Sequence, residues 1–149
     1  MRLTSSAFTN EGIIPARFTC DAEDINPPLS WQDAPAGVRS FALVVDDPDA
    51  PLGTWTHWTL WNMPSSANSI GERQIPPGSV EGKTSFGRSG WGGPCPPSGT
   101  HRYFFRLYAL DTTFESLSAS TTVSTLMNTM KGHVMATAEL MGRYQRIKK

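Results

Sequence analysis

The chain has 149 residues, which is the size of one domain and enough to bury a core without a metal or a disulfide. Its 13 basic and 13 acidic residues cancel, so the sequence lacks the basic surplus of a general nucleic-acid-binding protein. No stretch approaches the ~18 consecutive apolar residues that span a bilayer, and residues 1–6 lack the apolar region of a signal peptide. We therefore expect one domain over residues 1–149, with neither a transmembrane segment nor a nucleic-acid partner. A cytoplasmic location is the default expectation, and an exported mature chain that has lost its signal peptide is the alternative.

Apolar residues alternate with period two, the pattern of a β-strand, in several segments of the first 110 residues. The pattern predicts long strands over 40–46, 55–62 and 101–110, and shorter ones over 3–8, 29–32 and 79–84. In the 55–62 segment, His57 and Trp61 fall on one predicted face and Trp58 falls on the other. Because both faces carry large aromatic side chains, we expect this strand to be covered on both sides.

A helical pattern appears only near the C-terminus. Apolar residues recur at three- and four-residue spacing from Val123 to Met141, and a hydroxyl among residues 120–122 would cap the first turn. Gly132 disfavours the middle of this segment, so one helix or two shorter ones are expected, followed by a strand over 143–147. Many short strands followed by C-terminal helices predict a mainly β sandwich with helices packed at one end.

The two cysteines, Cys20 and Cys95, lie far apart in the chain and form no CxxC motif. Their spacing matches neither a zinc finger nor a redox motif. In an oxidising compartment they could form a disulfide, but in a cytoplasmic protein free thiols are the expected state.

Three segments beside predicted strand ends carry chemically reactive side chains. An acidic cluster occupies 46–49, His57 lies in an aromatic strand, and a Gly/Pro-rich loop leads into His101 and Tyr103, which share a face by parity. Taken singly, these segments have ordinary readings: a polar turn, a core histidine and a rigid connection. Together they offer imidazole and phenol donors, backbone N–H groups, and an Asp that would orient a His and favour its charged form. This combination suits a small anion such as phosphate.

The same segments resemble the signature of the phosphatidylethanolamine-binding protein family, also called Raf kinase inhibitor-like proteins. The resemblance rests on Asp47-Pro48-Asp49-Ala50-Pro51, the His57 segment and Gly99-Thr100-His101-Arg102-Tyr103. Further blocks at 18–21, 26–31, 93–97 and 132–142 resemble the shorter, prokaryotic-type branch. The resemblance implies an antiparallel β-sandwich with helices near the C-terminus, and a pocket for phosphate-like anions and phospholipid headgroups.

Carried over residue by residue, the resemblance implies an anion-binding set of Asp47, His57, His101 and Tyr103. It also implies a set of supporting residues around the pocket, namely Asp49, Pro51, Trp55, Gly93, Cys95 and Pro96. No catalytic residue, metal or cofactor is expected. The expected ligand is a small anion such as phosphate or phosphoethanolamine, and a kinase or protease partner and a homodimer are further expectations.

The alternative function is a hydrolase that uses the same pocket. Its histidines and Asp would hold a metal ion, or Cys95 would act as a nucleophile beside His101. The sequence has no HExxH or similarly compact metal motif, and prolines flank Cys95 without any signature of activation. Binding without catalysis is therefore the favoured interpretation. Thr56 stands where larger eukaryotic members often have a second His, which weakens the carry-over of kinase inhibition.

Overall fold

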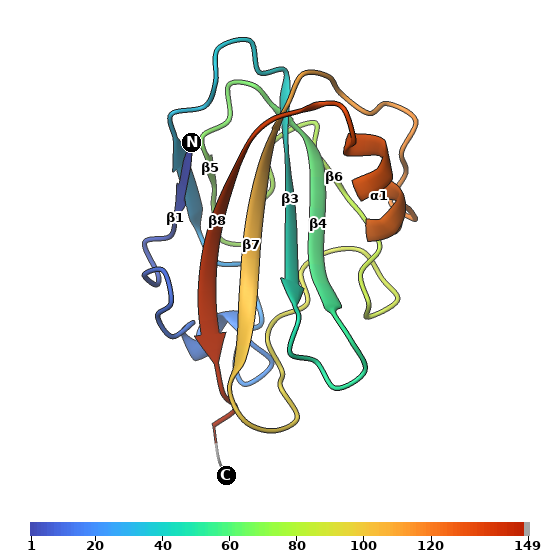
Figure 1. Cartoon of the computed structure of the whole chain (residues 1–149). Helices are drawn as coiled ribbons and strands as arrows, with labels where there is room; N and C mark the ends of the chain where they lie inside the picture. The colour runs from blue at the N-terminus through green and yellow to red at the C-terminus, as the bar shows by residue number, and fades with distance from the viewer. Residues whose placement is uncertain (148–149) are drawn as a thin grey trace.

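The computed structural model describes residues 1–147 as two antiparallel β-sheets, one short α-helix and one turn of 3-10 helix. The strands are β1 (Arg2–Thr4), β2 (Leu29–Gln32), β3 (Ser40–Asp47), β4 (Trp55–Pro64), β5 (Ser69–Ile70), β6 (Val80–Glu81), β7 (His101–Leu110) and β8 (Val134–Tyr144). The 3-10 helix η1 covers Ala16–Phe18 and the helix α1 covers Val123–Met130. The larger sheet has the order β6-β4-β3-β7-β8 and the smaller has the order β1-β2-β5 (Figure 1).

The main core fills the space between the two sheets, as expected for a sandwich. Leu29 and Trp31 of β2 alternate with exposed residues and pack in the same cluster as Leu43 and Phe105 of the larger sheet. A second cluster lies on the outer face of the larger sheet, where α1 packs beside β4 (Figure 1). β4 is therefore buried on both faces, as its aromatic residues predict.

The predicted sandwich and its long strands are confirmed. The strands at 40–46, 55–62 and 101–110 correspond to β3, β4 and β7, and the one at 29–32 is β2. The short strands predicted at 3–8 and 79–84 shrink to three and two residues. No helix among residues 1–147 is long and apolar enough to cross a membrane.

The helix predicted to continue past Gly132 is wrong. Residues 134–144 form β8, which pairs along its length with β7, and this strand also replaces the one expected at 143–147. The helical spacing of Val134, Ala138 and Met141 misled, because Ala136, Ala138 and Leu140 satisfy a period of two. The side chains of these last three residues pack on the main core. Pairing with β7 therefore outweighed the local pattern, as tertiary context often does.

The predicted faces of β4 are wrong beyond His57, because its register against β3 shifts at two places, the first of which is a bulge at His57. Thr56 pairs with Asp46 and Trp58 pairs with Val45, so one step along β3 spans two steps along β4. His57 is the extra residue, and both it and Trp58 lie on the inner side, beside Tyr103 and in the main core respectively. Trp61 instead packs in the outer cluster. A bulge of this kind re-aims a side chain, here that of His57.

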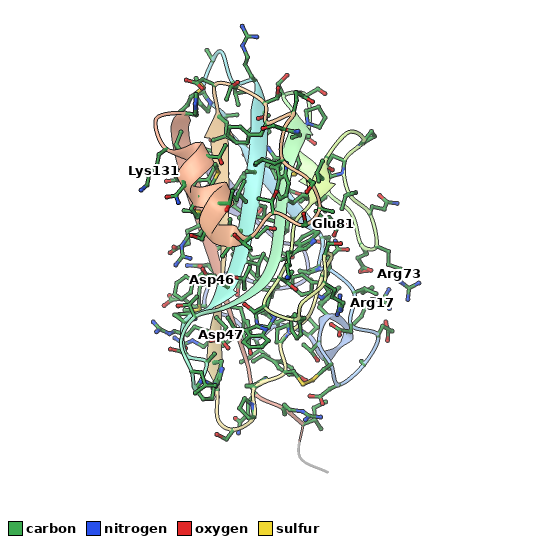
Figure 2. The ribbon with its side chains drawn as sticks, turned by 90° about the vertical axis from the view of Figure 1, so that its right-hand side faces the viewer. Arg17, Asp46, Asp47, Arg73, Glu81 and Lys131 are labelled. Atoms are coloured by element: carbon green, nitrogen blue, oxygen red, sulfur yellow. A yellow bond between two sulfur atoms is a disulfide. The ribbon has the colours of Figure 1, made fainter. Side chains whose placement is uncertain are left out.

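The expectation of free thiols is also wrong: Cys20 and Cys95 form a disulfide, drawn as the yellow bond in Figure 2. Their Cα atoms lie 5.5 Å apart although the residues are separated by 75 positions. The sequence could not show this proximity, because it arises when the 90–100 loop packs on the segment after η1. That packing includes a backbone hydrogen bond from the Cys20 N–H to the Pro94 carbonyl.

The C-terminal segment is fastened by one carboxylate, Asp21, next to the disulfide. Its side chain is only 1% exposed and accepts hydrogen bonds from the Tyr144 hydroxyl, the Arg146 guanidinium and the Ile147 N–H. The Tyr144 hydroxyl and then the Ile147 N–H hold the pKa of Asp21 below its ordinary value, against the opposing effect of burial.

We expect Asp21→Asn to lower the midpoint of thermal unfolding at neutral pH. Since the folded-state pKa is depressed, the charge stabilises the fold above the unfolded value of about 3.9. That stabilisation is lost as the pH falls through the lower folded-state pKa. Thermal unfolding from neutral to strongly acidic pH should show the native protein and the variant converging in acid. A difference that stayed constant with pH would contradict this assignment.

Candidate anion-binding site

The candidate residues meet at one end of the larger sheet, where three neighbouring strands begin or end. β3 ends at Asp47, whereas its antiparallel neighbours β4 and β7 begin there, with Trp55 and His101. Asp47 pairs directly with Trp55 across the β3–β4 ladder. This end of the sheet is the lower one in Figure 1, and Figure 2 labels Asp47 at the same end of β3. Antiparallel pairing thus brings together side chains that are remote in the sequence.

A cavity of about 230 Å³ opens between these strand ends and the loops beside them. It is lined by Asp47, Ala50, Pro51, Trp55, His57, Phe86, Cys95, Pro96, Pro97, His101 and Tyr103. The polar residues of the lining come from the strands, and the surrounding wall consists mainly of aromatic, proline and cysteine side chains. Its volume is small for a drug-sized ligand and suits a compact polar group.

Asp47 and His101 form a buried pair in this cavity. Asp47 is 3% exposed and His101 is 8% exposed, and the His101 Nδ1 lies 2.6 Å from the Asp47 Oδ2. Since the carboxylate accepts, Nδ1 carries the proton and the Nε2 atom is left for the cavity. The other Asp47 oxygen accepts the Asp49 N–H at 2.8 Å, which fixes the carboxylate at the start of the loop.

His57 is held by a backbone carbonyl. Its Nδ1 lies 2.6 Å from the Gly92 oxygen, and the ring makes edge contacts with Tyr103 and Phe86. Burial lowers the pKa of His57, and the Gly92 carbonyl and the charge of Asp47 oppose this effect only partly. The geometry and the burial therefore favour a neutral ring with its proton on Nδ1.

Tyr103 contributes a buried hydroxyl that has no hydrogen-bond partner within residues 1–147. Burial, reinforced by the charges of Asp47 and Asp49, raises the pKa of this phenol, so it stays protonated and can donate. An unpaired buried hydroxyl costs about 1–3 kcal/mol, and a ligand that accepts its hydrogen bond recovers that cost. The cavity thus holds a preorganised donor.

Two predicted supporting residues, Asp49 and Gly93, do not line the cavity. Asp49 accepts three hydrogen bonds from Arg102, two from the guanidinium and one from the backbone N–H. These hydrogen bonds hold the pKa of Asp49 at about 2. It therefore fastens the loop after β3 to the start of β7. The Gly93 N–H donates to Asp24, and a Cβ there would lie 2.3 Å from the Phe18 carbonyl oxygen. Gly93 thus permits the close approach of two backbones.

The structure brings every other predicted residue into the cavity: Asp47, Pro51, Trp55, His57, Cys95, Pro96, His101 and Tyr103. Sequence reasoning missed Phe86, which is 39% exposed and closes one side. Its signal is weak, a single aromatic between Ser85 and Gly87 in a polar loop. Residues 1–147 contain no group of three or more His, Cys, Asp or Glu placed to hold a metal ion.

Comparison with known proteins decides the family. A sequence model described as "Phosphatidylethanolamine-binding protein" matches residues 4–145. The chain belongs to the phosphatidylethanolamine-binding protein (PEBP) family. A UPF0098 protein of the archaeon Methanothermobacter thermautotrophicus is 47% identical over 98% of this chain and 99% of its own length.

Two solved structures show the same fold. A PEBP homologue of Chlamydia trachomatis superposes with a TM-score of 0.93 and 38% identity, covering 98% of this chain and 97% of the other. Escherichia coli YbcL, described as a new member of the mammalian PEBP family, gives 0.91 and 29%, with 98% of both chains covered. Membership in the PEBP family supports a ligand-binding role in general, which is consistent with the cavity described above.

Proposed function

We propose that the chain binds a small phosphate-like anion, such as phosphate or phosphoethanolamine, between His57, His101 and Tyr103. The observation that carries this proposal is the unpartnered Tyr103 hydroxyl, which lies in the same small cavity as the Asp47–His101 pair. A protonated His101 would add a second donor, and Asp47 would stabilise its charge. The apolar wall shields these hydrogen bonds from water and so strengthens them.

Calorimetric titration with phosphoethanolamine tests this proposal. We expect His101→Ala to lower the affinity about tenfold or more, since it removes a charge-assisted hydrogen bond. His133 supplies a matched control, because its Nδ1 also pairs with a carboxylate, that of Asp111, at 2.8 Å but outside the cavity. His133→Ala should bind like the native protein. Undiminished binding by His101→Ala would contradict the proposal.

A hydrolase based on Cys95 is disfavoured by its chemistry. Cys95 is bonded to Cys20, so it offers no thiolate for attack while the bond is intact. The absence of catalysis stays a prediction, and a phosphomonoesterase assay with the purified protein would test it.

Regulation of a kinase or protease and formation of a homodimer are proposals that rest on the family resemblance. Co-purification from native cells and analytical ultracentrifugation would test them respectively. A cytoplasmic location likewise stays a prediction, and the disulfide between Cys20 and Cys95 is of a kind more common in oxidising compartments. Fractionation of native cells would decide it.

A further inference from the structure

The hydrogen-bonding roles of the cavity follow from what each side chain already contacts. The Gly92 carbonyl can only accept, so the His57 Nδ1 must donate to it across their 2.6 Å separation. In a neutral ring this leaves a lone pair on Nε2. Among the hydrogen bonds of the described residues, the ring of His57 takes part through Nδ1. His57 therefore presents an acceptor to the cavity that it lines, not a donor.

The groups around His57 do not supply a surplus of positive charge. The charged or titratable side chains that face it are Asp47 of β3, Asp24 of the segment after η1, and Tyr103 and His101 of β7. The Asp47 carboxylate offsets the charge of a protonated His101. A dianion would meet a pocket without net positive charge, and one of its oxygens would face the lone pair of His57.

We propose that the cavity selects an oxyanion that still carries one proton of its own, the monoanion of a phosphate monoester, over fully ionised anions of the same shape. The ligand O–H would donate to the His57 Nε2, and its other oxygens would accept from Tyr103 and His101. This inference rests on the proposed function and adds the protonation state and the ester class of the ligand. His57 is then the specificity-determining residue.

Methyl phosphate and methyl sulfate form a matched pair of probes. At about pH 5.5 most of the methyl phosphate is singly charged, since the second pKa of a phosphomonoester is about 6. Methyl sulfate has the same charge and a similar shape but no O–H. We expect calorimetry to show methyl phosphate binding about tenfold or more tightly, the range of a hydrogen bond to a charged group. The preference should shrink at about pH 8, where the phosphomonoester has lost its proton.

Dimethyl phosphate separates a diester headgroup from a free monoester. It is a monoanion without an O–H, like the phosphate of a phospholipid, and should bind as weakly as methyl sulfate. If dimethyl phosphate bound as tightly as methyl phosphate, or more tightly, the selection of monoesters would be overturned.

Variants separate the role of His57 from general damage to the site. His57→Phe should abolish the preference for methyl phosphate, because a phenyl ring has no lone pair to accept the ligand O–H. Tyr103→Phe should weaken both probes by a similar factor and leave their ratio unchanged. Circular dichroism would establish that each variant is folded, and if His57→Phe is not, the ratio of the two affinities in the native protein and its change with pH decide the matter.

The outcomes distinguish the two proposals. Failure of the native protein to bind either probe would overturn the anion site itself and this inference with it. Equal affinity for methyl phosphate and methyl sulfate would overturn the inference alone, as would a preference that survives in a folded His57→Phe variant.

Discussion

Replacing both Cys20 and Cys95 by Ser is expected to lower the free energy of unfolding by about 4 kcal/mol. The disulfide joins residues 75 positions apart, so it removes much of the conformational freedom of the unfolded chain. Urea denaturation monitored by tryptophan fluorescence would measure the loss. The native protein in excess thiol reductant is the control, because reduction should reproduce the stability of the double variant.

The same bond holds one wall of the cavity. Cys95 and Pro96 line it, and within the 94–97 stretch the three prolines have no N–H to donate. The double variant should therefore bind phosphoethanolamine more weakly as well as unfold more easily. A change in stability below about 1 kcal/mol would show that the packing of this loop, and not the covalent bond, supplies the constraint.

Phe105→Ala is expected to destabilise the protein by about 3–5 kcal/mol. Phe105 is fully buried in β7, where its ring contacts Phe8 at 5.7 Å and stacks on Trp91 at 6.1 Å between centroids. Its removal leaves a cavity under Trp91, whose indole N–H bonds to the Phe18 carbonyl next to the disulfide segment. Urea unfolding measures the loss.

The neighbouring phenylalanine is the matched control for this substitution. Phe104 lies on the opposite face of the same strand, partly exposed, with the guanidinium groups of Arg102 and Arg106 over its ring. Phe104→Ala should cost about 1 kcal/mol, the scale of exposed cation–π contacts. Similar losses for the two variants would contradict the assignment of Phe105 to the main core.

The long strands were predictable because their side chains alternate between a core face and another environment. Val45 and Phe105, for example, lie in the main core at the positions that period two assigns to them. β8 was not predictable from local pattern, because Val134, Ala138 and Met141 fit a helical spacing whereas Ala136, Ala138 and Leu140 fit a period of two. Only pairing with β7 decides between the two patterns. The bulge at His57 was hidden as well, since it depends on the register against β3.

The candidate site was predictable in composition but not in arrangement. The motifs identified Asp47, His57, His101 and Tyr103, and all four line one cavity. Residue types cannot show that Asp47 pairs with His101 whereas His57 is bonded to a carbonyl. The two histidines therefore have different electrostatic environments, which only the packing of the Gly92 backbone reveals.

The bulge has a consequence for comparing this chain with its relatives. On its N-terminal side, the odd-numbered residues Trp55 and His57 line the cavity. On its C-terminal side, the even-numbered residues Trp58 and Leu60 pack in the core. β4 thus changes phase between His57 and Trp58, and the residues on the two sides of this point meet different requirements, the cavity before it and the core after it. A relative that lost one residue at this point could keep every core contact of β4 and yet turn its histidine away from the ligand. Alignments guided by hydrophobic alternation alone would overlook such a loss, because the core half would still match.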